Sequence, residues 1–249
     1  MTKILAIDSS TEACSVAILD NDKIYQRYQL APRRHAELLL PMVDELLKES
    51  GLSLPDLDAI ACCVGPGAFT GLRIAVSVAQ GLAFASKLPC IAVSSLEILA
   101  INAFKQTDAN ICLSAIDARM KEVYFAVFMR KNEYDATLIE QECVHNPLEI
   151  ELDKYSINRE SGIVFVGSGW SEYEFSASIK QLKLIQLESN QLEFKQVDRQ
   201  FPNAVDMLST ADDSFKANKL LKPEQLQPIY IRNNVAKKKL LKKQPIIDN

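Results

Sequence analysis

The sequence predicts an α/β protein of two lobes, each a mixed sheet flanked by helices. A strand, an acidic turn and a second strand occur at 4–19 and recur about a hundred residues later at 111–129, which is a weak internal repeat. Strand-like and helical apolar patterns alternate along the chain. We expect 1–106 to form the first lobe, 107–232 to form the second, with a last helix that could return to the first, and 233–249 to be a basic, flexible tail.

Composition narrows the class of protein. The 249 residues carry a formal charge of −4 and 48% of them are hydrophobic, so the chain can build a core but does not suit a protein that coats nucleic acid by itself. Six cysteines in a chain of this length do not make a disulfide framework, which indicates a reducing compartment. The start of the chain is too polar for a signal peptide, and no apolar run approaches the roughly 20 residues of a membrane helix. We therefore expect a cytoplasmic protein with no membrane contact.

Strands open the first lobe and an amphipathic helix follows them. The three expected strands have alternating or continuous apolar residues: Ile4–Ile7, Ala13–Leu19 and Ile24–Gln29.

In the segment His35–Glu49, apolar residues recur in pairs four apart, which draws one stripe along a helix: Leu38, Leu39, Met42, Val43, Leu46 and Leu47. Pro41 should kink this helix, because it removes a backbone hydrogen bond. Leu40 lies off the stripe, which indicates either a broad core-facing surface or a second packing partner.

A glycine-rich turn, Gly-Pro-Gly-Ala-Phe-Thr-Gly-Leu-Arg-Ile at 65–74, organises the rest of the chain. It should deliver the strand Leu57–Val64 into a helix, with Thr70 as N-cap. The turn lacks the lysine of a phosphate-binding loop, so Arg73 is the only fixed cation nearby in the sequence. Two interpretations stay open: a tight turn with Arg73 tied to a carboxylate, or a ligand or partner site.

The helix expected at Thr70–Ser86 is apolar on every side and rich in small residues. Such a helix must be covered all round, either within one chain or partly by another subunit. The sheet of a small lobe covers one side only, and small side chains permit close approach of a second helix.

The remaining elements are expected in this order: a strand at Pro89–Val93, a helix at Ser95–Phe104 capped by Ser95, strands at Ile111–Ile116 and Glu122–Met129, a strand at Ile163–Val166 entering a glycine turn at 167–169, and helices at Ser171–Leu182 and Asn203–Ser209. The region 188–200 is ambiguous, and 228–232 is extended by its prolines.

The inventory of reactive side chains is short. Only two histidines are present, His35 and His145, and neither has a second histidine three or four residues away to make a helical metal pair. We expect both to lie at the surface or in a loop. A serine or cysteine nucleophile would need a base beside it, and the sequence has no Gly-x-Ser-x-Gly elbow. The carboxylates of Asp8 and Asp117, on acidic turns, keep an ATP-dependent kinase open as an alternative.

Four blocks in order resemble the TsaB (YeaZ) family of bacterial tRNA threonylcarbamoyladenosine biosynthesis proteins: Gly65–Ile74, Ile4–Val16, Asp117–Tyr124 and Pro228–Arg232. The resemblance implies a two-lobed actin-like ATPase (ribonuclease-H-like) fold, in a degenerate relative of the catalytic protein TsaD. In that superfamily the turn after the first strand, here Asp8–Thr11, holds phosphate and magnesium. TsaD carries a metal-binding histidine pair, which this sequence lacks.

The resemblance also implies a function. This chain would be the non-catalytic subunit that binds and activates a TsaD-type catalytic subunit, in a complex that modifies adenosine 37 of tRNAs reading codons beginning with adenine. It would have no catalytic, metal or cofactor site of its own, and ATP would be used by the assembled complex. A TsaE-type ATPase would join the complex, tRNA would bind through it, and the chain alone would form a homodimer. The implied interface lies on the two helices: Leu39, Leu40, Val43, Thr70, Gly71, Arg73, Val76, Ala79 and Ala83.

Overall fold

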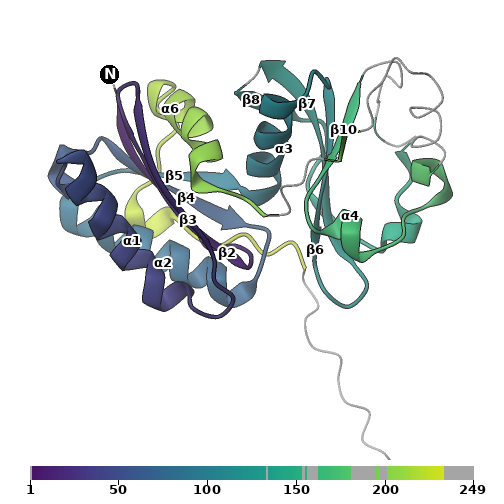
Figure 1. Ribbon diagram of the computed structural model, residues 1–249, viewed down its shortest axis with the longest axis horizontal. Coiled ribbons are helices and arrows are strands. Elements are labelled where there is room, and N and C mark those ends of the chain that lie inside the picture. The colour runs from purple at the N-terminus through teal and green to yellow at the C-terminus, as the bar shows by residue number, and fades with distance from the viewer. Residues whose placement is uncertain are drawn as a thin grey trace, which may run out of the picture.

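The structure, a computed structural model, describes residues 2–132, 134–152, 155, 162–180, 195–196 and 201–232. Two mixed sheets stand side by side with helix α3 between them, and further helices cover their outer faces (Figure 1).

The first sheet has the strand order β3-β2-β1-β4-β5. Strand β2 runs antiparallel to both neighbours, whereas β4 and β5 run parallel to β1. Helices α1 and α2 cover one face, and the short helix η4 with α6 covers the other. The bounds are β1 Lys3–Asp8, β2 Ala13–Asp20, β3 Lys23–Leu30, α1 His35–Ser50, η1 Leu54–Asp56, β4 Ala59–Gly65, α2 Phe69–Ser86, β5 Cys90–Ser94, η4 Ala204–Met207 and α6 Leu208–Lys216.

The second sheet repeats this plan. Its order is β11-β10-β6-β7-β8, with β9 also paired to β7; β7 is antiparallel to β6, while β10 and β11 are parallel to it. The bounds are α3 Ser95–Gln106, β6 Ile111–Asp117, β7 Val123–Asn132, β8 Asp135–Leu138, β9 Cys143–His145, η2 Pro147–Glu149, β10 Ile163–Val166, α4 Gly169–Glu172 and β11 Lys195–Gln196. The short helix η5, Pro223–Gln225, lies against α2 of the first lobe. Two sheets of the same order and pairing confirm the predicted two-lobed actin-like fold.

Alternation along β1 explains the two covered faces of the first sheet. Leu5 and Ile7 point into the core beneath α1 and α2, and Ile4 and Ala6 point into the core beneath η4 and α6. Helix α3 packs between the two sheets, and nine of its residues are buried. Ile98 of α3 packs on the first sheet, while other residues of the same helix pack on the second.

Several local expectations were wrong. Helix α2 begins after Ala68, so Thr70 is not its N-cap; in α3 the cap is Ser94, whose hydroxyl accepts the N–H groups of Leu96 and Glu97, and not Ser95. The single helix expected at Ser171–Leu182 is divided, because α4 ends at Glu172. Strand β8 was not expected, and β9 occupies a segment expected as loop. Most of 188–200 and the basic tail 233–249 lie outside the described residues, and the lobe bounds stay a prediction.

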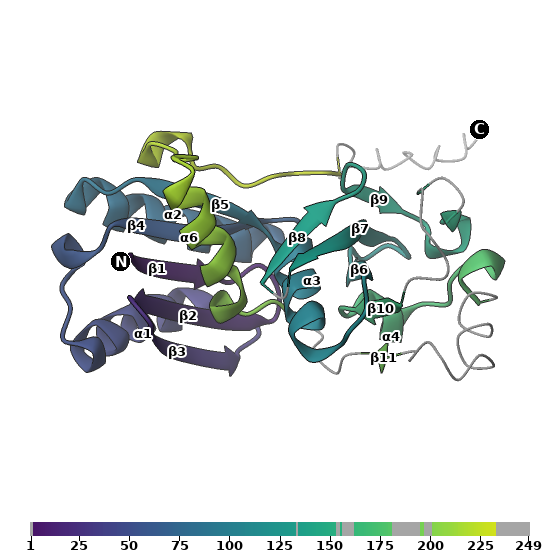
Figure 2. The ribbon, with the colours of Figure 1, turned by 90° about the horizontal axis from the view of Figure 1, so that it is seen from above.

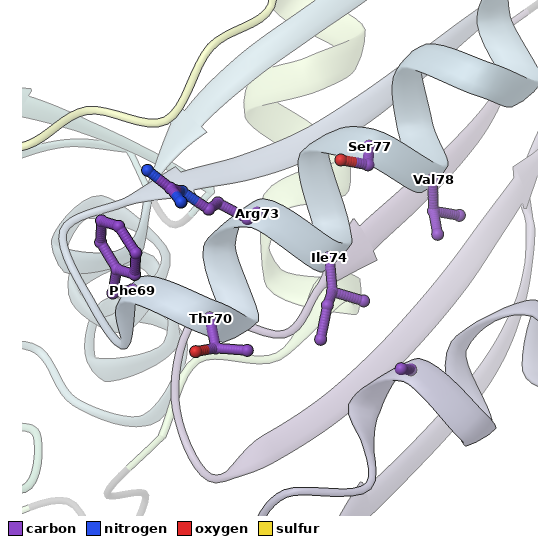
Figure 3. A pocket seen from close by; sticks show the side chains of 7 residues that line it. Phe69, Thr70, Arg73, Ile74, Ser77 and Val78 are labelled. Carbon is purple, nitrogen blue, oxygen red and sulfur yellow. The ribbon is translucent and has the colours of Figure 1, made fainter.

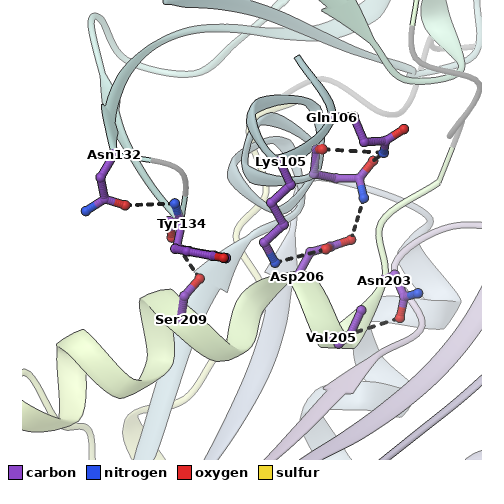
Figure 4. A network of polar contacts seen from close by, with 9 residues as sticks. Lys105, Gln106, Asn132, Tyr134, Asn203, Val205, Asp206 and Ser209 are labelled. Carbon is purple, nitrogen blue, oxygen red and sulfur yellow. Dashed lines mark hydrogen bonds and ion pairs between the residues drawn. The ribbon is translucent and has the colours of Figure 1, made fainter. Parts of the chain in front are cut away.

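A polar network joins the lobes beside α6 (Figure 4). The buried carboxylate of Asp206 accepts a hydrogen bond from Asn102 Nδ2 at 3.0 Å and pairs with Lys105 Nζ at 3.2 Å, so η4 is held to α3. Ser209 Oγ donates to the carbonyl oxygen of Tyr134 at 2.7 Å, which connects α6 to the turn before β8. The returning segment 203–216 therefore ties the second lobe to the first.

Glu97, at the start of α3, should make stability depend on pH. Burial raises its pKa to about 7, with a smaller contribution from the carboxylates of Glu142 and Asp135, and Thr210 Oγ1 donates to it at 3.3 Å. The folded state binds more protons than the unfolded state between pH 4.5 and about 7, so the free energy of unfolding falls as pH rises through this window. Glu97→Gln should remove this slope and stabilise the protein by about 2 kcal/mol above pH 7. Urea unfolding at pH 5 and pH 8 measures both effects, and equal slopes in the variant and the parent would contradict them.

Candidate functional site

The two helices of the first lobe present an exposed outer surface. Helices α1 and α2 lie next to each other on the same face of the first sheet (Figure 1). Between them is an open groove of about 440 Å³, lined by Ala36 of α1 and by six residues of α2: Phe69, Thr70, Arg73, Ile74, Ser77 and Val78. Figure 3 shows Thr70, Ile74 and Val78 on the side of α2 that is nearer to α1. We call these seven residues together with Leu40, Gly81 and Phe84 the outer face.

The outer face is unusually apolar for exposed helix surface. Leu40 is 50% exposed, Phe69 53% and Phe84 77%. Large exposed apolar groups that gather on one surface mark an interaction site more often than isolated ones do. Both helices therefore pack with one side on their own sheet and leave an apolar side without cover in the described part of the chain.

The nine predicted interface residues separate into two groups. Leu40, Thr70 and Arg73 belong to the outer face. The other six are buried within the first lobe, where they hold α1 and α2 on the sheet: Leu39, Val43, Gly71, Val76, Ala79 and Ala83. The interface itself stays a prediction, but in this structure only the first group can touch another molecule.

Sequence reasoning missed the other seven residues of the outer face: Ala36, Phe69, Ile74, Ser77, Val78, Gly81 and Phe84. A signal for two of them existed, because Thr70, Ser77 and Phe84 follow one another at intervals of seven and share one side of a helix. The uniform apolar character of the segment hid this side.

Helix α2 also has the length and composition of a membrane span, with 18 residues and a mean hydropathy of 1.2. Core helices of globular proteins have the same properties, and α2 buries one side against the first sheet. Its composition is explained by that buried side together with the apolar outer face.

The glycine turn closes over the turn at Asp8–Thr11. A Cβ atom on Gly67 would lie 2.2 Å from the carbonyl oxygen of Ser10, and one on Gly71 would lie 2.0 Å from that of Ser9. Ala68 N–H donates to the Ser10 carbonyl at 2.7 Å, and Ser9 Oγ donates to the Gly71 carbonyl at 2.9 Å. Glycine is required here because the two turns touch through their backbones.

Asp8 is sealed beneath this contact. Its side chain is fully buried, and Oδ1 accepts the N–H of Ser10 at 3.0 Å. Burial raises the pKa of the carboxyl, which favours its neutral form. Oδ2 has no hydrogen-bond partner among the described residues. A carboxyl that is fully buried is not open to a magnesium ion in this arrangement.

Asp117, the corresponding acidic residue of the second lobe, is occupied by its own chain. Its Oδ1 accepts hydrogen bonds from the Tyr173 hydroxyl at 2.6 Å and from the Arg119 N–H at 2.7 Å, and Oδ2 pairs with the Arg119 guanidinium at 2.9 Å. Burial and the Asp117 carboxylate raise the pKa of Tyr173 to about 12, so its hydroxyl stays a donor. Both candidate carboxylates for phosphate chemistry are therefore engaged or covered.

The sequence left two interpretations of Arg73 open, and the carboxylate partner of the first is not found among the described residues. The Arg73 guanidinium lies 3.7 Å from the centre of the Phe69 ring, and Nε donates to the Tyr230 hydroxyl at 3.0 Å. Tyr230 in turn packs on Phe69, with 5.5 Å between ring centres. Arg73 thus joins the first turn of α2 to the segment near residue 230 through cation–π and hydrogen-bond contacts.

The two histidines lie in different surroundings. His35 is buried at the start of α1, contrary to the surface position we expected, and His145 is exposed at the end of β9. Across the described residues, no group of three or more His, Cys, Asp or Glu side chains could hold a metal ion.

The chain is similar to known proteins over most of its length. A family model described as TsaD, tRNA N6-adenosine threonylcarbamoyltransferase, matches residues 18–249. The TsaB protein of Escherichia coli is 38% identical over 244 residues, covering 96% of this chain and 98% of that protein; the TsaB protein of Haemophilus influenzae is 36% identical, covering 95% and 96%. The solved structure of YeaZ from Pseudomonas aeruginosa superposes with a TM-score of 0.78 at 37% identity, covering 92% of this chain and all of that one.

Proposed function

The chain belongs to the TsaB (YeaZ) family of tRNA threonylcarbamoyladenosine biosynthesis proteins, and from this premise we propose that it is the non-catalytic subunit that binds and activates a TsaD-type catalytic subunit. Relatives of this name act in the biosynthesis of threonylcarbamoyladenosine in tRNA, and we place this chain in the same pathway. The observation that carries the proposal is the outer face, an exposed apolar surface on two helices next to the glycine turn.

The outer face suits a protein partner of similar fold. Its centre is apolar and aromatic and its one charged group is an arginine, which is the composition of the buried centre of protein interfaces. A second copy of this chain would bring the same surface, so the isolated protein would close as a two-fold homodimer. The catalytic subunit would then compete with that second copy.

The two acidic turns, which carry Asp8 and Asp117, support a non-catalytic role. A kinase of this fold needs open carboxylates on both acidic turns, whereas Asp8 is buried and Asp117 pairs with Arg119 and Tyr173. The alternative, a stand-alone ATP-dependent small-molecule kinase, would require the glycine turn to move away from Ser9 and Ser10. Nothing in the contacts of that turn favours such a movement.

We propose the rest of the assembly by analogy with the family. ATP would be used by the assembled complex and not at a site on this chain, a TsaE-type ATPase would join the complex, and tRNA would bind through it. Such a complex would act in the cytoplasm, where tRNA is modified.

Sedimentation of the purified protein, alone and mixed with a TsaD-type catalytic subunit, tests the proposal. We expect a homodimer alone and a complex with the catalytic subunit at the expense of that homodimer. Calorimetry of the isolated chain should show no tight binding of Mg-ATP. Tight binding that is lost in Asp8→Ala would favour the kinase, and unchanged sedimentation on mixing would contradict the proposed partner.

A further inference from the structure

The segment Leu226–Arg232, which we call the strap, leaves the first lobe and ends against the second. Figure 2 shows it running along one edge of the molecule, from the helices of the first lobe to the second sheet. It contains no helix or strand, so its position depends on the contacts that its side chains and backbone make.

The strap is anchored in the first lobe by its beginning and middle. Leu226 is fully buried in the core beneath α1 and α2. Gln80 of α2 donates through Nε2 to the carbonyl oxygens of Pro223 and Leu226, at 3.1 and 2.8 Å. Ile229 N–H donates to the carbonyl oxygen of Val64 at 2.8 Å, directly before the glycine turn. These bonds fix the strap against α2 and the end of β4.

The end of the strap reaches the second lobe. Arg232, whose side chain is 14% exposed, forms an ion pair with Glu122 and donates to the carbonyl oxygen of Arg119. Both partners belong to the turn at 118–122, which joins β6 to β7. This turn is conformationally strained, because Arg119, Met120 and Lys121 have φ angles of 62°, 57° and 65°. Three successive left-handed residues that are not glycine persist only where surrounding contacts hold them. Arg232 supplies contacts on one side of the turn, and Glu12 of the first lobe pairs with Arg119 on another.

The middle of the strap holds the outer face. Tyr230 accepts the hydrogen bond from Arg73 and packs on Phe69, and both of these residues line the groove between α1 and α2. One short segment thus contacts the strained turn of the second lobe, the glycine turn and the first turn of α2.

We infer that the strap is a latch that couples the spacing of the two lobes to the shape of the outer face. When Arg232 is seated on the strained turn, Tyr230 is held against Arg73 and Phe69. A change in lobe spacing pulls on Arg232 and frees the first turn of α2; reciprocally, a partner that fixes Phe69 and Arg73 favours the seated strap. What binds the outer face rests on the proposed function, but the latch itself does not.

Hydrogen–deuterium exchange on the isolated protein, at a concentration low enough to keep the chain monomeric, tests the latch. Arg232→Ala removes the contact with the second lobe and touches nothing on α2. We expect amide exchange to become at least about tenfold faster in peptides spanning 69–76 and also in peptides spanning 118–122. The matched control is Arg34→Ala, which removes an exposed arginine–carboxylate pair at the start of α1 and should leave both regions unchanged. Faster exchange at 118–122 alone, or no change at either place, would overturn the latch.

A second variant distinguishes a local effect on α2 from general unfolding of the protein. Tyr230→Phe keeps the ring on Phe69 but removes the oxygen that accepts from Arg73, so exchange at 69–76 should rise while the melting temperature stays within a few degrees of the parent. Exchange at 69–76 equal to that of the parent would overturn the inference. Because these measurements need no partner, failure of the proposed function would appear separately, as unchanged sedimentation on mixing with a catalytic subunit.

Discussion

Replacing Ser77 by Arg is expected to abolish pairing through the outer face without harming the fold. Ser77 is exposed on α2 and lines the groove beside Ile74 and Val78, so the monomer can carry a longer side chain there. In a paired state the new guanidinium would be buried without a partner, and in the homodimer it would lie near its symmetry copy. We expect affinity to fall by at least about a hundredfold, which corresponds to about 2.7 kcal/mol.

Sedimentation over a range of protein concentrations measures this loss, for the homodimer and for the mixture with a catalytic subunit. Ser171→Arg is the matched control, since it places the same charge at an exposed position of α4 in the second lobe. Normal pairing by Ser77→Arg would show that the outer face is not the interface. Ala79 would be a poor choice for this test, because it is fully buried and an arginine there would disrupt the core of the first lobe.

The second large effect concerns the two glycines of α2. A methyl group on Gly71 would lie 2.0 Å from the backbone oxygen of Ser9, so Gly71→Ala must push the glycine turn away from the Asp8–Thr11 turn. We expect this to cost about 3 kcal/mol in the free energy of unfolding. A methyl group on Gly81 meets nothing within 4 Å, so Gly81→Ala should stabilise the same helix by about 0.5–1 kcal/mol.

Urea unfolding of both variants, at a protein concentration low enough to keep the chain monomeric, gives the two values. The comparison is informative because the free energy of unfolding is expected to fall in one variant and to rise in the other, although both glycines lie on one helix. A Gly71→Ala variant as stable as the parent would mean that the two turns are not in contact, and the covered state of Asp8 would then have to be abandoned.

Much of the fold could be predicted because its signals are local. Alternation and apolar runs placed β1, β2 and β3 within one or two residues of their observed ends, and the stripe at 35–49 predicted α1. The weak repeat of strand, acidic turn and strand was confirmed as a true repeat of sheet order. Where several side chains could cap a helix, as at Ser94 and Ser95, sequence could not decide, since both are caps by residue type.

The candidate site was harder to predict because it depends on which side of a helix meets the sheet. Thr70–Ser86 is apolar on nearly every side, so its hydropathy did not separate Ala79, which is buried, from Phe84, which is exposed. Only the seven-residue spacing of Thr70, Ser77 and Phe84 marked the exposed side. The partners of Arg73 were also hidden, because Tyr230 lies far away in sequence and reaches α2 only through the path of the strap. Such contacts follow from tertiary structure and leave no local pattern.

The most direct test of the central claim is threonylcarbamoyl transfer to tRNA by a purified TsaD-type subunit and a TsaE-type ATPase, with the adenylate-forming enzyme supplied, in the presence and absence of this protein. We predict that activity appears only when this protein is added, that this protein alone has none, and that Ser77→Arg fails to restore it while Ser171→Arg restores it fully. Equal activity without this protein would contradict a required non-catalytic subunit.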